Sequence, residues 1–200
     1  MNFAELFALL AVTVVTIMIP GPDFVIVSRN AITCSRKAGI ITAFGVSTAI
    51  WVHIIYSIYI IRFAHENSEF LMSFLKYCGA TYLLYLGYRS LRPGLQSSTR
   101  LKEQKRENYW VQGFVNNLLN PKATLFFISV FSQVISKDTI LLTQIEYGLV
   151  ITVVCLSWFT ILPCLLTTDR MAPVVKKILN PLEKIAGVLF IAFSMSTFFL

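Results

Sequence analysis

Apolar residues occur in long runs separated by short polar segments, a pattern unlike the alternating or amphipathic spacing of soluble proteins. Six runs approach the roughly 20 residues that a helix needs to cross about 30 Å of hydrocarbon. The runs predict membrane-spanning helices at 3–27, 39–61, 70–91, 111–135, 147–167 and 184–200. We therefore expect an all-α membrane protein, a six-transmembrane-helix bundle that forms one domain over residues 1–200.

The composition supports this class. Hydrophobic residues make up 56% of the chain, charged residues 14%, and the mean hydropathy is +0.70, whereas soluble domains carry about 25% charged residues. The start, Met1-Asn2-Phe3-Ala4-Glu5, has no basic segment and no small-residue cleavage site after it. The first run is therefore predicted to stay as a helix and not to be removed as a signal peptide.

Basic residues gather in alternate loops. Of the 17 Lys and Arg, 13 follow the first, third and fifth spans, at positions 29, 36, 37, 89, 92, 100, 102, 105, 106, 170, 176, 177 and 184. The positive-inside rule then places the loop 92–108 in the cytoplasm and both termini on the periplasmic side of a bacterial inner membrane. The net charge of +7 has the same origin, so we expect no nucleic-acid partner.

The sequence also indicates an internal duplication of a three-helix unit. Three predicted spans precede the loop 92–108 and three follow it, and an odd number of spans inverts the second half relative to the first. Each half opens with a proline-broken helix and closes with a helix starting Lys-x-x-Gly, at 76–79 and 184–187. Inverted repeats with discontinuous helices at matching positions are typical of transporters. We therefore expect two inverted three-helix repeats.

The first helix is interrupted by Pro20-Gly21-Pro22-Asp23. Prolines remove backbone donors, and a charge near the middle of a membrane helix costs roughly +2.5 to +3.5 kcal/mol on insertion. Asp23 is the one acidic residue among ten that is not near a span end or in a loop. The N-terminus of the resumed helix favours an anion, so Asp23 either receives an ammonium group or caps the helix.

The fourth span carries a second interruption at Asn120-Pro121-Lys122. Asn120 is predicted to cap a half-helix whose first residue is Pro121, and Lys122 adds a positive charge suited to a carboxylate. The alternative is that Lys122 extends its stem toward the cytoplasmic face. Asn116 and Asn117 lie one turn earlier and are predicted to face a polar cavity, because lipid does not accommodate their amides.

Two further residue types bear on the chemistry. His53, in the middle of the second span, is a candidate proton relay, or a histidine that simply hydrogen-bonds a neighbour. The cysteines form no C-x-x-C pair and are interpreted as packing residues; they are Cys34, Cys78, Cys155 and Cys164. A fixed anion, a fixed cation and several amides together complement a small zwitterionic solute such as a free amino acid.

Four stretches that span nearly the whole chain carry a family likeness. They are Pro20-Gly21-Pro22-Asp23-Phe24 with Val27-Ser28, Ser35-Arg36-Lys37 leading to Gly39 and Gly45, Gly79-x-x-Tyr82-Leu83-x-Tyr85-Leu86-Gly87, and Asn117-x-x-Asn120-Pro121-Lys122-Ala123. At these residues the chain resembles the LysE/RhtB family of amino-acid exporters. Val130-Phe131-Ser132 and Trp158-Phe159-Thr160 are most similar to the threonine and homoserine efflux branch. The resemblance implies an inner-membrane exporter driven by the proton gradient.

Other functions fit the residues less well. A membrane-embedded thiol-redox carrier needs the missing C-x-x-C pair, and a heavy-metal cation exporter needs several carboxylates or thiolates in the membrane. An intramembrane hydrolase needs an activated nucleophile beside a base. We therefore expect a transporter and not an enzyme, without a cofactor or a metal site. Its expected partners are an amino-acid substrate, protons and the lipid bilayer, and the oligomeric state is left open.

Overall fold

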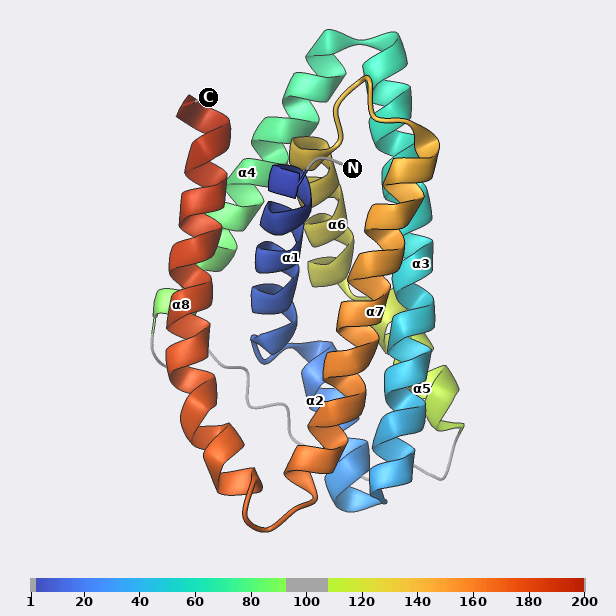
Figure 1. Ribbon diagram of the computed structural model, residues 1–200, viewed down its shortest axis with the longest axis vertical. Coiled ribbons are helices and arrows are strands. Elements are labelled where there is room, and N and C mark those ends of the chain that lie inside the picture. Colours follow the sequence, from blue (N-terminus) through green and yellow to red (C-terminus); the bar gives the residue numbers. More distant parts are fainter. Residues whose placement is uncertain (1–2, 93–107, 200) are drawn as a thin grey trace.

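The computed structural model describes residues 3–92 and 108–199, and this part of the chain is helical without any strand (Figure 1). Most of the predicted loop 92–108 therefore lies outside the described residues. The helices, in chain order, are α1 (Phe3–Met18), α2 (Pro22–Thr33), α3 (Arg36–Asn67), α4 (Glu69–Leu91), α5 (Tyr109–Leu118), α6 (Pro121–Val134), α7 (Leu141–Leu166) and α8 (Ala172–Phe199).

Two pairs of long helices enclose the shorter α1, α2 and α6, whereas α5 begins at the outer edge of the bundle beside α3. In Figure 1, α3 and α7 run side by side along one flank, and α4 and α8 lie on the other. Helix α1 contacts both α7 and α8, while α6 contacts both α3 and α4. The half-helices α2 and α5 pack against α3 and against each other. The ends of the short helices therefore meet inside the bundle, near its mid-height.

Both predicted helix breaks are confirmed. Helix α1 ends at Met18 and α2 begins at Pro22, with a bend of 52° between them. Helix α5 ends at Leu118 and α6 begins at Pro121. In each case proline is the first helical residue, where its missing N–H costs nothing because that donor has no intrahelical partner.

Two turns are short because serine side chains start the following helices. The Ser35 hydroxyl accepts a hydrogen bond from the Ala38 N–H at 3.1 Å and opens α3. The Ser68 hydroxyl accepts from the Leu71 N–H at 3.1 Å and opens α4 directly after α3. Each cap satisfies an N–H group that the helix itself leaves unpaired.

Two helices, α3 and α7, are long and apolar enough to cross a membrane, and the bent pair α1 and α2 is a third if it forms one span. Several helices extend beyond the predicted spans. Helix α7 begins six residues earlier than expected, and α8 begins 12 residues earlier. Hydropathy identifies only the apolar residues that can lie in hydrocarbon. The helices are longer than the predicted spans because helical hydrogen bonding continues into the polar segments on either side.

One sequence detail is wrong. The Lys-x-x-Gly segments 76–79 and 184–187 do not start helices; they lie within α4 and α8. Their glycines serve helix packing instead. A Cβ built on Gly187 would lie 2.8 Å from the Gly87 carbonyl oxygen, so the backbones of α4 and α8 approach closely, as small residues allow in membranes. The Ser194 hydroxyl on α8 stabilises the interface between α4 and α8 by donating a hydrogen bond to the Ala80 carbonyl at 2.7 Å.

The contact between α3 and α5 depends on two further glycines. A Cβ on Gly113 would lie 2.1 Å from the Thr42 carbonyl oxygen, and one on Gly45 would lie 2.0 Å from the Trp110 carbonyl oxygen. Neither carbonyl can move without moving its helix. These two positions therefore set how close α5, which leads into the second break, lies to α3.

We expect Gly113→Ala to lower the free energy of unfolding by about 3 kcal/mol, the upper part of the range for overpacking. Thermal unfolding of the purified protein in detergent measures the effect. Gly148→Ala is the matched control, because its nearest neighbour would be the Ile54 Cγ2 methyl at 2.8 Å, a side-chain atom. Equal melting temperatures for the two variants would contradict the close backbone approach.

Candidate functional site

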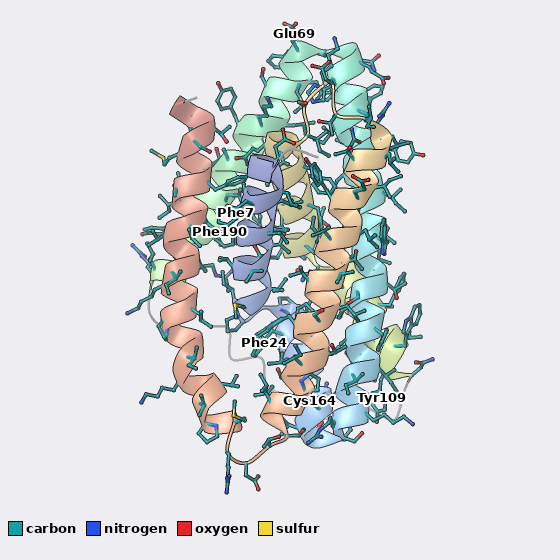
Figure 2. The ribbon with its side chains drawn as sticks, in the orientation of Figure 1. Phe7, Phe24, Glu69, Tyr109, Cys164 and Phe190 are labelled. Atoms are coloured by element: carbon teal, nitrogen blue, oxygen red, sulfur yellow. The ribbon has the colours of Figure 1, made fainter. Side chains whose placement is uncertain are left out.

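The two helix breaks meet at a cavity of about 50 Å³. Its walls come from α1, α2, α3, α5, α6 and α7 and from the residues of the breaks. The lining residues are Thr13, Thr16, Ile17, Ile19, Gly21, Pro22, Asp23, Phe24, Ile50, Asn117, Asn120, Lys122, Ala123, Phe126, Phe127, Cys155 and Phe159. Phe24, labelled in Figure 2, lies below the end of α1, in the lower half of the bundle as drawn. The cavity is therefore mainly apolar, with opposite charges at the two breaks.

The Asp23 carboxylate is held by three asparagine amides. Its Oδ1 accepts from Asn116 Nδ2 at 2.9 Å, and its Oδ2 accepts from Asn117 Nδ2 at 3.1 Å and Asn120 Nδ2 at 2.9 Å. The cap of α2 is Gly21, which makes no side-chain hydrogen bond. The interpretation of Asp23 as a helix cap is therefore wrong, because its oxygens face α5 and the second break.

A carboxylate offers about four acceptor positions, of which the amides use three. Asp23 can therefore still accept from an incoming donor. Beside it, the Asn117 side-chain oxygen is buried and has no hydrogen-bond partner in the described part of the chain. These two acceptors together suit an ammonium group, which carries three donors.

The Lys122 side chain crosses to the first break. Its Nζ donates to the Thr16 carbonyl through a long hydrogen bond of 3.5 Å, near the end of α1 where the helix dipole is negative. A Cβ on Gly21 would lie 3.3 Å from this nitrogen, so the lysine lies against the bare backbone of the glycine. The ammonium group therefore lies at the cavity wall, and Lys122 is not extended toward either face of the bundle.

The two charged residues are placed in the same way. Asp23 and Lys122 are each the second residue of a half-helix that begins with proline. Asp23 reaches across to Asn120 at the second break, and Lys122 reaches across to Gly21 at the first. Asn120 itself caps α6, as predicted, by accepting from the Lys122 N–H at 3.0 Å. Each charged side chain thus contacts the helix break in the other half of the chain.

His53 is linked to this network through the backbone of α5. Its Nε2 lies 3.0 Å from the Asn117 carbonyl oxygen; because a carbonyl only accepts, Nε2 carries the hydrogen. Its Nδ1 then accepts from the Tyr56 hydroxyl at 2.6 Å. The ring is buried and stacks on Phe127 with a centroid distance of 5.8 Å. His53 therefore contacts the backbone of Asn117, and the side-chain amide of the same residue binds Asp23.

The structure brings the ten predicted site residues together around the breaks. Gly21, Pro22, Asp23, Asn117, Asn120 and Lys122 line the cavity. The other four surround it: Pro20 lies between α1 and α2, Pro121 is the first residue of α6, Asn116 binds Asp23, and His53 contacts Asn117.

Sequence reasoning missed the residues that α1 and α7 contribute. Thr13 and Thr16 line the cavity from α1, and Cys155 and Phe159 line it from α7. Nothing in the sequence distinguishes them from other small or aromatic residues in apolar helices. Cys155 is buried and Cys164 partly so, but Cys34 and Cys78 are exposed, which corrects their interpretation as packing residues. In the described ranges no group of three His, Cys, Asp or Glu residues is placed to hold a metal ion.

Comparison with known proteins adds a family likeness over almost the same length. The family model described as LysE type translocator matches residues 14–198. The chain is 28% identical to the threonine efflux protein of Salmonella typhi over 195 residues, which cover 94% of this chain and 95% of that protein.

Two further relatives cover similar lengths. The threonine efflux protein of Escherichia coli strain K12 is 28% identical over 192 residues, covering 92% of each chain. An uncharacterized membrane protein of Bacillus subtilis is 25% identical over 205 residues, covering 96% of this chain and 98% of the relative. No solved structure gives a significant match.

Proposed function

The chain belongs to the LysE type translocator family, and from that premise we propose that it exports a small neutral amino acid in exchange for protons. It is a transporter and not an enzyme. The relatives named threonine efflux proteins support a substrate similar to threonine, and the sequence resemblance adds homoserine as the other candidate. The proposed location is a bacterial inner membrane.

The observation that carries the proposal is the pair of opposite charges on one cavity. Within the described lining, Asp23 is the one acidic residue and Lys122 the one basic residue. A zwitterion places its ammonium group against Asp23 and the Asn117 side-chain oxygen, and its carboxylate against Lys122. The apolar wall accommodates the aliphatic part of a small side chain.

Proton coupling is proposed to run through Asp23. The substrate ammonium and a proton compete for the same carboxylate, so one leaves as the other binds, and this exchange is the basis of antiport. His53 is proposed to assist, because its ring contacts the backbone of Asn117, whose amide holds Asp23. In the tautomer described above, its Nδ1 is the site that accepts a proton.

The size of the cavity indicates a closed state. A cavity of about 50 Å³ is well below the roughly 150 Å³ of a cavity that holds benzene, and threonine has more non-hydrogen atoms than benzene. The bundle must therefore open before the substrate enters. Because α1 and α7 pack against each other and both line the cavity, we propose that movement between these helices opens it.

The proposed membrane arrangement has six spans in two inverted repeats. The pairs α1 with α2 and α5 with α6 each form one broken span, and α3, α4, α7 and α8 form the others. A 32-residue helix such as α3 is about 48 Å long, so it spans the hydrocarbon and extends beyond it. Residues 1–200 form a single domain in this arrangement, and the homo-oligomeric state is not part of the proposal.

Orientation follows from the basic residues. The connections α2–α3 and α7–α8 lie at the lower end in Figure 1 and the α3–α4 and α6–α7 connections at the upper end. Arg36 and Arg170 lie at the lower end, which is therefore proposed to be cytoplasmic together with the loop 92–108. Both termini are then periplasmic.

We expect a membrane-impermeant maleimide applied to intact cells to label a cysteine at position 67 and not Cys34. Asn67 is exposed where α3 ends, and Cys34 is exposed between α2 and α3. Each protein keeps a single cysteine, the other native ones being replaced by serine. Permeabilised cells, in which both positions should react, provide the control. Labelling of Cys34 from outside would reverse the proposed orientation.

The function itself is tested by counterflow in proteoliposomes. Vesicles loaded with unlabelled threonine should accumulate labelled threonine, and an imposed pH gradient should drive net uptake or release in vesicles without a threonine gradient. A panel of neutral, acidic and basic amino acids defines the substrate class. Absence of counterflow for every neutral amino acid, with correctly inserted protein, would overturn the proposal.

A further inference from the structure

One hydroxyl on the cavity wall has no hydrogen-bond partner. Thr13 lies on α1, is fully buried, and lines the cavity one turn before Thr16. Its Oγ1 is buried and makes no hydrogen bond within the described residues. A buried polar group without a partner is unfavourable and uncommon in folded proteins, so this hydroxyl needs an explanation.

Several other helical threonines make a local hydrogen bond that Thr13 does not make. In a helix, a threonine hydroxyl readily bonds the carbonyl four residues earlier. That bond is made by Thr16 to Val12 at 2.6 Å, Thr42 to Ala38 at 2.8 Å, Thr152 to Gly148 at 2.9 Å and Thr160 to Leu156 at 2.7 Å. Thr13 leaves this local acceptor unused even though it is buried, so its hydroxyl keeps the capacity to bind something in the cavity.

The other polar groups of the lining already have partners or assigned roles. The Thr16 hydroxyl binds Val12, and the Asn120 side chain binds both Asp23 and the Lys122 N–H. The proposed function assigns Asp23 with the Asn117 oxygen to the substrate ammonium, and Lys122 to the carboxylate. Thr13 is then the remaining polar side chain with hydrogen-bonding capacity for the rest of the substrate.

We propose that the Thr13 hydroxyl hydrogen-bonds a polar group on the side chain of the transported amino acid and so selects hydroxylated substrates over apolar substrates of the same shape. The inference rests on the proposed function of this site. A substrate hydroxyl gives Thr13 its missing partner. An apolar side chain of equal volume leaves the Thr13 hydroxyl without a hydrogen-bond partner. A site that hydrogen-bonds a substrate hydroxyl therefore binds an analogue without that hydroxyl much more weakly.

The test compares threonine with valine, which replaces the threonine hydroxyl by a methyl group. In proteoliposome counterflow we expect wild-type protein to transport threonine about tenfold faster than valine at low concentration, as one hydrogen bond allows. Thr13→Val should bring the ratio close to one, and Thr13→Ser, which keeps the hydroxyl, should retain a clear preference for threonine. Thr152→Val is the matched control and should leave the ratio unchanged, because its hydroxyl is bound to the Gly148 carbonyl and Thr152 is not among the residues that line the cavity.

Stability separates this role from a packing role. Removing an unpaired buried hydroxyl should leave the melting temperature in detergent unchanged or raised for Thr13→Val. An unchanged threonine-to-valine ratio in Thr13→Val, with wild-type transport intact, would overturn the inference and leave the proposed function standing. A complete lack of amino-acid counterflow in wild-type protein would overturn both. If Thr13→Val does not insert, loss of the preference in Thr13→Ser would likewise count against the hydroxyl.

Discussion

Asp23→Asn is expected to reduce proton-driven amino-acid efflux at least about 100-fold while the protein still inserts. The substitution keeps the shape and removes the one negative charge of the described cavity lining. In the proposed complex the carboxylate pairs with the substrate ammonium. Loss of one partner of such a hydrogen-bonded charge pair costs about 2–5 kcal/mol, and about 2.7 kcal/mol corresponds to a factor of 100. Efflux from preloaded cells or vesicles, normalised to inserted protein, measures the effect.

The control must separate charge from hydrogen bonding, because the new amide would face three amide donors. Asn116→Ala removes one of the hydrogen bonds to Asp23 and leaves the charge in place. We expect this variant to lose only about tenfold in efflux, because two amides still hold Asp23. One hydrogen bond to a charged group contributes about 1.5 kcal/mol at the lower end of its range, close to the roughly 1.4 kcal/mol of a tenfold change. Near-normal efflux from Asp23→Asn would show that the carboxylate only fastens α2 to α5.

The helix breaks could be predicted from the sequence because proline acts locally. Pro22 and Pro121 lack the donor and have the fixed dihedral angle that suit the first residue of a helix, and α2 and α6 begin at those residues. Pro163 and Pro181 lie inside α7 and α8, so the neighbouring Gly21 and Asn120 were needed to mark the breaks. The cap at Asn120 follows from the same local chemistry. The other helix ends were harder to predict, because the apolar stretch and the helical hydrogen bonding end at different residues.

The partners of the charges could not be predicted. Asp23 and Asn116 are 93 residues apart in the chain, and no periodic pattern connects them. The sequence suggested that Lys122 adds its charge to the start of its own helix, whereas the side chain crosses to Gly21 and Thr16. Such crossing contacts depend on how α6 packs beside the first break, which only the folded bundle defines.

Thr13 shows a different limit. Threonine in an apolar helix usually bonds its own backbone, so neither its type nor its position marks it as a site residue. Its role emerges only from the combination of full burial, a place on the cavity and an unpaired hydroxyl. Cys155 and Phe159 could not be identified from the sequence either, because they line the cavity only through the packing of α7 against α1.

The crossed arrangement of Asp23 and Lys122 also explains how a substrate could open the closed cavity. In the structure, Asp23 binds the amides of the second half and Lys122 binds the break of the first half. Under the proposed function, a zwitterion would offer each charge a new partner that competes with these contacts between the two halves. The substrate would then lower the cost of the movement that carries it across, as alternating access requires.

Lys122→Gln is expected to remove the preference of the transporter for an amino acid over its amide. Threoninamide keeps the ammonium group and lacks the carboxylate, so it cannot form the charged hydrogen bond proposed between the substrate carboxylate and Lys122. Loss of one partner of a hydrogen-bonded charge pair at a binding site costs about 2–5 kcal/mol. Wild-type protein should therefore transport threonine at least about 100-fold faster than threoninamide, since about 2.7 kcal/mol corresponds to that factor. In Lys122→Gln the ratio should fall below about 10, because glutamine pairs equally well with an acid or an amide.

The matched control is Lys137→Gln, which removes the same charge from an exposed position between α6 and α7. It should leave the ratio of threonine to threoninamide transport at the wild-type value, because this lysine is remote from the cavity lining. Both rates are measured by uptake into proteoliposomes under the same pH gradient. If Lys122→Gln lowers both rates by the same factor and keeps the ratio, then Lys122 only braces the first break, and the carboxylate of the substrate must bind elsewhere.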